Sequence, residues 1–345
     1  MNSRTSGLSR NERPNILLKR FAYDKDQITQ RYCMLNKFLS LIILIRYGRL
    51  PIDIKYYYRD TYICQLNQLK YVLKDYLFKP KYKELSFHGE FAPELQFTLP
   101  FAYWHFKNGT LKSTRSSKYT KEMYFFSENH DEHFQTRNNE GNYNYEMPRV
   151  LYSQDYDMEK WLPVPLKETY ANQVYVYDKP VLIIANRYNM EWDGPPVSFY
   201  SVEMLGYMLD RLRDKYTIIY NRPRPQNITM DNSDIYDMDE FGWLKSEYPE
   251  VILMEDLFTE NKGKANNFNH LQMMVYANAS KFISIHGGTA TLASYFGGTN
   301  LILSKKGPEH HFKCFEKLYP KFSGATILHA KTDEEVKNYI GTYFE

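Results

Sequence analysis

The sequence has few cysteines and no long hydrophobic run, and both absences narrow the class of protein. Its three cysteines, Cys33, Cys64 and Cys314, are widely separated and odd in number. That pattern fits neither a disulfide framework nor a zinc site, so we expect a reducing compartment. The longest apolar run, Phe38 to Ile45, is far shorter than the roughly 20 residues that a membrane-spanning helix needs. It also starts too late, and lacks the cleavage site, for a signal peptide. We therefore predict a cytoplasmic protein without a transmembrane segment.

Two glycine signatures of nucleotide-binding proteins are missing as well. No G-x-x-x-x-G-K-S/T run is present, which argues against P-loop ATPases and kinases. No G-x-G-x-x-G run is present either, and a prominent double glycine lies late in the chain instead of after a first strand. The chemistry must therefore come from another arrangement.

What the sequence does contain is typical of a folded protein, and its length is sufficient for two domains of ordinary size. It has 345 residues, of which 43% are hydrophobic and 25% charged, so extensive disorder is not expected. Aromatic residues make up 17%, a high share that suits stacking on carbohydrate or bases but equally suits a bias in codon usage. Residues 1–90 carry 17 Lys and Arg against 8 Asp and Glu, whereas residues 231–260 carry 10 acids against one Lys. Such an asymmetry would steer an anionic ligand or hold two domains together.

The first half of the chain has an irregular pattern, and we predict an acceptor-side α/β domain over residues 15–165. A polar stretch from Lys107 to Glu146 is typical of a long loop, and the proline-containing Glu159 to Gln173 is a candidate linker. The other expected elements are helices over 27–47 and 62–76 and strands over 51–58 and 84–88.

The second half alternates short apolar runs with helical patterns, which indicates a parallel sheet covered on both faces. We predict a Rossmann-like domain over 175–330 and a closing helix over 331–345. The expected strands are 180–186, 216–221, 250–256, 281–287, 300–305 and 325–330, and the expected helices are 201–215, 269–279, 289–296 and 333–344.

The stretch "KFISIHGGTATLASYFGG" places His286, Gly287, Gly288 and Thr289 where a buried strand meets a helix. Ligands of open parallel sheets bind beyond the carboxyl ends of the strands, and glycine lets an anion approach the backbone closely. We therefore expect a diphosphate at this turn, although a simple tight turn would need the same glycines. The second pair, at 297–298, is interpreted as the end of the helix.

This segment, continued to Glu309, resembles the donor domain of GT-B glycosyltransferases, and most of all metal-independent members such as glycosyltransferase family 61. The resemblance implies an α/β fold of the two-domain GT-B type, with a Rossmann-like parallel-sheet C-terminal domain and a less regular α/β N-terminal domain. It also implies that Gly287, Gly288 and Thr289 hold the donor pyrophosphate, that His286 lies beside it, and that Glu309 binds ribose or sugar hydroxyls.

Other donor-binding candidates follow from their positions after predicted strands. Asn186 and Arg187 end the first strand of the second half, and an arginine fork matches phosphate oxygens. Arg222 follows the next strand and would flank the nucleotide, unless it is a solvated loop residue. Glu255 is placed to bind a base or ribose edge, unless it is a surface carboxylate.

Glycosyl transfer with inversion needs a base that removes the acceptor proton. In "LSFHGEFAPE", His88 and Glu90 follow a predicted strand next to a glycine, and they are the candidate catalytic residues, with Glu90 ahead. A structural or solvated role is the alternative for each. A retaining enzyme would need no separate base.

The function predicted from the sequence is a glycosyltransferase that moves a sugar from a nucleotide-diphosphate donor to a glycan or other hydroxyl acceptor, without a metal or other cofactor. One alternative is a GT-A enzyme that holds Mn²⁺ or Mg²⁺ with Asp155 and Asp157. Another is a non-catalytic glycan- or nucleic-acid-binding protein, in which "KYYYRDTY" at 55–62 would supply the stacking surface. We do not expect nucleic acid as a partner.

Overall fold

The computed structural model describes residues 33–138, 146, 159–191, 194–230 and 234–345. Contacts along the chain divide it into two units, Met1–Tyr62 and Ile63–Glu345. This division falls elsewhere than the predicted boundary between residues 165 and 175, which stays a prediction. Within the described ranges, no helix is both long enough and apolar enough to span a bilayer.

The first unit contains helix α2 (Cys33–Tyr47) and most of helix α3 (Ile52–Leu69), which continues into the second unit. The strand predicted over 51–58 is wrong, because its tyrosines lie on α3. Ile54 and Tyr58 are buried four residues apart, which is the spacing of one helical turn. In a short run that consists mostly of apolar and aromatic residues, this spacing is present together with the alternation of a strand, so the pattern alone does not decide between them. The rings of Tyr47 and Tyr58 lie 4.5 Å apart and join the two helices.

The second unit begins with a small parallel sheet in the order β1-β2-β3. Its strands are β1 (Lys83–Ser86), β2 (Leu111–Ser117) and β3 (His130–Phe134). The long loop predicted over 107–146 is therefore wrong in part, since two of these strands lie within it. Strand β3 reads HDEHF and is only half-buried, so it lacks the apolar run that marks a buried strand.

A six-stranded sheet follows, with the order β6-β5-β4-β7-β8-β9 and every neighbouring pair parallel. The protein is thus mixed α/β with parallel sheets, as predicted. The six strands lie where the apolar runs predicted them: β4 (Val181–Ala185), β5 (Thr217–Asn221), β6 (Ile252–Leu253), β7 (Ala279–Ile285), β8 (Thr299–Leu303) and β9 (Thr326–Ala330).

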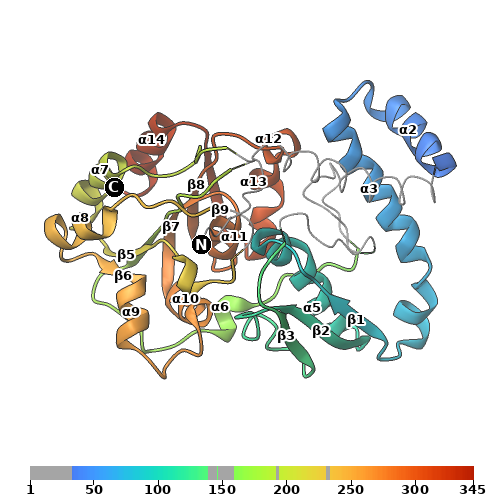
Figure 1. The fold of residues 1–345 in the computed structure, drawn as a ribbon, viewed down its shortest axis with the longest axis horizontal. Helices are drawn as coiled ribbons and strands as arrows, with labels where there is room; N and C mark the ends of the chain where they lie inside the picture. The colour runs from blue at the N-terminus through green and yellow to red at the C-terminus, as the bar shows by residue number, and fades with distance from the viewer. Residues whose placement is uncertain (1–32, 139–145, 147–158, 192–193, 231–233) are drawn as a thin grey trace, which may run out of the picture. The chain divides into compact units, whose positions relative to one another are not determined.

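Helices cover both faces of this sheet (Figure 1). Leu182 and Ile184 of β4 point into one core, which α7 (Val202–Leu212), α8 (Glu240–Glu247) and α14 (Asp333–Tyr343) complete. The alternate residues of β4 point into the other core. That core includes residues of the helices α10 (Phe268–Ala277), α11 (Gly288–Ser294) and α13 (Cys314–Lys317).

The second core continues without a break into the region of the small sheet. It includes Leu85 and Phe87 at β1, and also Val164 and Leu166 of the candidate linker. The linker segment is therefore packed against the sheet region and forms helix α6 (Leu166–Thr169). The remaining short elements are η1 (Leu73–Phe78), α4 (Phe91–Pro93), η2 (Glu94–Thr98), α5 (Leu99–Lys107), η4 (Pro225–Asn227), α9 (Met254–Glu260), α12 (Glu309–Phe312) and η5 (Tyr319–Phe322).

The glycine pair at 297–298 forms the turn between α11 and β8, as expected for a helix end. Both residues have positive φ, and a Cβ added to Gly298 would lie 2.0 Å from the carbonyl oxygen of Ser280. Glycine is required here because the backbones of two strands approach each other at this turn.

This close approach leads to a stability prediction. Gly298→Ala should lower the free energy of unfolding by about 3 kcal/mol or more, because strain in φ adds to a backbone clash. Gly324→Ala is the matched control: φ at Gly324 is +77° but no atom lies within 4 Å of the added Cβ, so only about 1–2 kcal/mol of backbone strain applies. Urea unfolding of both variants measures the difference, and equal losses would contradict the clash.

Candidate functional site

The order of the strands reverses between β4 and β7. From β4 the chain adds β5 and β6 on one side, and it then returns to add β7, β8 and β9 on the other. In an open parallel sheet, such a reversal opens a crevice beyond the carboxyl ends of the two strands, where ligands bind. The residues that follow β4 and β7 here are Arg187 and the glycine turn at His286.

Arg187 joins the two strand ends. Its Nη1 donates a hydrogen bond of 3.2 Å to the carbonyl oxygen of His286, and its Nη2 lies 3.3 Å from Oε1 of Glu191. Gly287 has φ +96°, and a Cβ there would come within 2.8 Å of Nη1. Glycine at 287 therefore allows both the positive φ of the turn and the close approach of the Arg187 guanidinium. One fifth of the Arg187 side chain stays exposed, so a ligand can still reach it.

His286 is buried at this turn. Its Nε2 lies 3.9 Å from Oε2 of Glu191, and its backbone N–H donates to the carbonyl oxygen of Leu303. Burial lowers the pKa of His286 well below its ordinary value, and the positive charge of Arg187 lowers it further. The imidazole is therefore neutral at pH 7.

Two carboxyl groups face Arg187. Glu191 is buried, and its Oε1 accepts a hydrogen bond from the backbone N–H of Ser198. Glu309 begins α12, and burial raises the pKa of its carboxyl, which Arg187 opposes and Glu191 reinforces. Neither Oε2 of Glu191 nor Oε2 of Glu309 has a hydrogen-bond partner among the described residues. Nε of Arg187 also has no partner, so the site keeps both donors and acceptors that polar groups of a ligand would satisfy.

Gly288 is held close by packing. A Cβ on Gly288 would come within 2.7 Å of the ring of Phe91, the first residue of α4. This glycine therefore lets α4 lie against α11. Thr289 follows in the first turn of α11 and is half-buried, whereas Thr291 donates to the carbonyl oxygen of Gly287 at 2.8 Å.

The packing of α4 also places the candidate base near the turn. Glu90 directly precedes Phe91 and is half-buried. His88 lies further along: its Nε2 is 2.8 Å from the carbonyl oxygen of Thr136, and its ring stacks on Phe134 at 4.2 Å. The structure thus brings the segment of Glu90 beside the glycine turn and ties His88 to β3.

Asn186 and Arg222 lie in the interior, contrary to the donor-binding roles predicted for them. The Asn186 side chain donates to the carbonyl oxygen of Tyr200 and to the hydroxyl of Tyr220, and its Oδ1 accepts from two backbone N–H groups. Arg222 forms a buried ion pair with Glu240. Both side chains use their polar atoms inside the protein, so they hold the strand ends in place.

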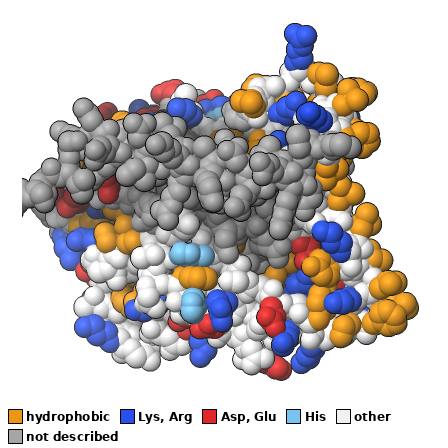
Figure 2. Space-filling model, turned by 45° about the vertical axis from the view of Figure 1, so that its right-hand side comes forward, with side chains coloured by type: hydrophobic (Ala, Val, Ile, Leu, Met, Phe, Trp, Pro, Cys, Tyr) orange, Lys and Arg blue, Asp and Glu red, His pale blue; other side chains and the backbone are white. Residues whose placement is uncertain are grey.

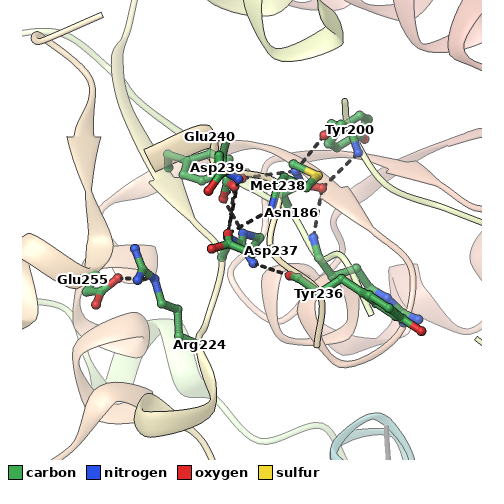
Figure 3. Close-up of polar contacts among 12 residues, drawn as sticks. Asn186, Tyr200, Arg224, Tyr236, Asp237, Met238, Asp239, Glu240 and Glu255 are labelled. Atoms are coloured by element: carbon green, nitrogen blue, oxygen red, sulfur yellow. Dashed lines mark hydrogen bonds and ion pairs between the residues drawn. The ribbon is translucent and has the colours of Figure 1, made fainter. Parts of the chain in front are cut away.

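Arg222 also binds Asp237 at 3.1 Å, which takes up one carboxylate of the D-x-D triplet at 237–239. Figure 3 shows Asp237 and Glu240 together, and the pair of Arg224 and Glu255 apart from them. Oε2 of Glu255 lies 2.9 Å from Nε of Arg224. Glu255 is the second residue of α9, a position compatible both with binding a base or ribose and with a role as a surface carboxylate. Asp155 and Asp157 lie outside the described residues.

A second group of buried charges lies away from the glycine turn. Among the residues that the structure describes, Asp75, His105 and Glu146 bring their ligand-type atoms within 4.8 Å of one another. However, Asp75 binds the ammonium group of Lys160, and Glu146 binds that of Lys83. The two ammonium groups balance the two carboxylates, so this cluster acts as a structural network.

Sequence reasoning missed Glu191. It lies in the loop after β4, four residues beyond Arg187, and an acidic residue this close to a strand-end arginine was the available signal.

Comparisons with known proteins give little. No family model and no curated protein sequence matches this chain. Among solved structures, E. coli heptosyltransferase WaaC with ADP is similar at 10% sequence identity and a TM-score of 0.33, over 81% of this chain and 77% of that one.

The two buried histidines predict a loss of stability in acid. Burial lowers the pKa of His105 to about 2 and that of His286 well below its ordinary value. Each histidine takes up a proton near pH 6.5 in the unfolded chain. The unfolded state therefore binds more protons as the pH falls below about 6.5, and the free energy of unfolding drops by up to about 1.4 kcal/mol per pH unit for each histidine.

Urea unfolding between pH 8 and pH 5 measures this slope, in a range above the titration of ordinary carboxylates. His105→Asn is the comparison, because it removes one titrating group and should make the slope smaller. A slope should remain, because burial also lowers the pKa values of His130, His270 and His310. An unchanged slope in this variant would contradict the assignment for His105.

Proposed function

We propose that this protein is a glycosyltransferase of the GT-B type, which moves a sugar from a nucleotide-diphosphate donor to a hydroxyl acceptor. The observation that carries the proposal is the pairing of Arg187 with the His286–Gly287 turn at the point where the strand order reverses. The resemblance to family 61 is no part of the proposal.

Arg187 is proposed to bind the diphosphate. Its guanidinium carries a permanent charge and offers paired donors to phosphate oxygens. Glu191 now occupies part of that guanidinium, at 3.3 Å. A diphosphate therefore competes with Glu191, and Gly287 leaves the space beside Nη1 free of a side chain. During transfer the same contact stabilises the leaving diphosphate.

The unpaired carboxyl oxygens are proposed to bind hydroxyl groups of the donor. Oε2 of Glu309 and Oε2 of Glu191 are buried without a partner, and ribose or sugar hydroxyls can both donate to a carboxylate and accept from a protonated carboxyl. His286, neutral beside Glu191, completes the polar wall. Thr289 adds a hydroxyl in the first turn of α11, and Glu255 stays a more distant candidate.

Glu90 is proposed as the base that takes the acceptor proton, with His88 as the second candidate. Support comes from the packing of Phe91 on Gly288, which brings Glu90 beside the proposed diphosphate position. A base must lie within hydrogen-bond reach of the acceptor hydroxyl, and the acceptor would enter on this side. No metal is part of the proposal, because Arg187 supplies the positive charge.

Donor binding provides the first test. Calorimetric titration with UDP, GDP, ADP and CMP, each with EDTA or with Mn²⁺, should find one nucleotide that binds without metal. Arg187→Met should weaken that binding at least tenfold, because a charge-assisted contact with phosphate is lost. Glu191→Gln should strengthen it severalfold, since the competing charge is removed while Oε1 can still accept from Ser198.

Arg213→Met is the matched control for these variants. Arg213 forms an exposed ion pair with Glu250 at 3.5 Å, so its loss should leave nucleotide binding unchanged. Failure of every nucleotide to bind would overturn the proposal. Binding that requires Mn²⁺ would instead favour the GT-A alternative.

A second prediction concerns catalysis. With the donor identified, Glu90→Gln should lower kcat by about 10²–10⁴-fold, because a general base is lost, while the affinity for the nucleotide stays the same. Glu84→Gln is the control, since Glu84 pairs with Lys112 on the surface. A normal kcat in Glu90→Gln would transfer the role to His88 or to a mechanism without a protein base.

A further inference from the structure

In the segment from Leu66 to Lys81, apolar side chains are exposed and polar side chains are buried, the reverse of the usual arrangement. Six large apolar side chains of this segment lie at the surface, and two polar side chains, Gln68 and Asp75, are buried beneath them. We call the six the exposed apolar face: Leu66, Leu69, Val72, Leu73, Leu77 and Phe78, of which Phe78 is 69% exposed. Contiguous exposed apolar groups of this kind mark an interaction surface.

The buried side of the segment explains its orientation. Asp75 binds Lys160 and accepts a hydrogen bond of 2.6 Å from the hydroxyl of Tyr82, and Gln68 donates 3.1 Å to the carbonyl oxygen of Glu146. These polar contacts fix which side of the helix faces the protein. The apolar side therefore cannot turn inward without breaking a buried ion pair.

Basic residues share the exposed side. Lys70, Lys74, Lys79 and Lys81 are all exposed, and Asp75, the one acidic residue between Ile63 and Tyr82, is buried. Lys81 lies 3.9 Å from Glu128 in an exposed pair, which offsets one charge at the edge. Figure 2 shows hydrophobic and basic side chains lying together at the lower right of the view.

We propose that the exposed apolar face binds the surface of a membrane that contains anionic lipids. A peripheral membrane segment combines apolar side chains that enter the acyl boundary with lysines that reach anionic headgroups, and this segment has both on one side. The proposal does not depend on the transferase activity.

Charge separates this occupant from a second copy of the chain and from residues 1–32. A second copy in a symmetric dimer would place the same four lysines against one another, because a twofold interface pairs a patch with itself. The chain's own residues 1–32 carry seven Lys and Arg against three acids, so they share the sign of the face. Anionic lipid, in contrast, has a charge that complements the lysines of the face.

Sedimentation of the full chain with vesicles tests the proposal. The chain should sediment with vesicles of phosphatidylcholine and phosphatidylglycerol, and raised salt should weaken the binding. Leu77→Glu/Phe78→Glu should reduce the bound fraction at least about tenfold, because both side chains leave the acyl boundary. Lys70→Gln/Lys79→Gln should reduce affinity for these vesicles about fivefold for each lysine removed.

Val174→Glu/Val176→Glu is the matched control. These two valines are 50% and 58% exposed at another place on the surface, so this variant should bind vesicles as the unchanged chain does. All substituted positions are exposed, and thermal unfolding checks that each variant is folded. Equal binding to pure phosphatidylcholine, or unchanged binding by Leu77→Glu/Phe78→Glu, would overturn the proposal. The proposal would also be overturned if the unchanged chain bound no vesicles and formed a dimer that Leu77→Glu/Phe78→Glu abolishes.

Discussion

The packing of α4 and η2 against α11 is the contact on which the rest of the second unit depends. The ring of Phe91 occupies the space that a side chain at Gly288 would fill, and the hydroxyl of Tyr295 donates 2.6 Å to the carbonyl oxygen of Leu95. Gln96 donates to Thr291 in the same interface. Because these contacts are short and buried, the segment after β1 and the turn after β7 hold each other in position, and one core continues through both.

The charges at the strand ends balance one another before any ligand arrives. Arg187 faces Glu191 and Glu309, and burial favours the neutral forms of Glu309 and His286. Desolvated charges are costly unless they are paired, and Glu191 is the partner that Arg187 has within the chain. Under the proposed function, a diphosphate would have to compete with this internal pair.

Simple patterning predicted the six-stranded sheet well because each of its strands is an apolar run. Strand β4 is buried along its whole length, and parallel strands covered on both faces keep no polar alternation. The small sheet was not predicted because β3 carries His, Asp and Glu and has no fully buried residue, so it lacks the apolar run by which a strand is recognised. The tyrosines of α3 were misread as a strand, since aromatic residues favour strands unless tertiary packing selects a helix.

In the candidate site, too, some residues could be predicted from the sequence and others could not. Residues at strand ends could be predicted because the topology alone brings Arg187 and His286 together. The roles of Asn186 and Arg222 could not, since each is decided by partners distant in sequence, such as Tyr200 and Glu240. No local pattern shows whether a polar strand-end residue meets a ligand or another part of the chain.

The buried pairs of Asp75 with Lys160 and of Glu146 with Lys83 couple segments that are distant in the sequence. Their partners are separated by 85 and 63 residues, so each pair closes a long loop. Without Lys160, burial of Asp75 would leave its carboxylate without the opposite charge, which is costly. The burial of η1 and the placement of the chain at residue 160 therefore stabilise each other, although the two lie far apart in the sequence.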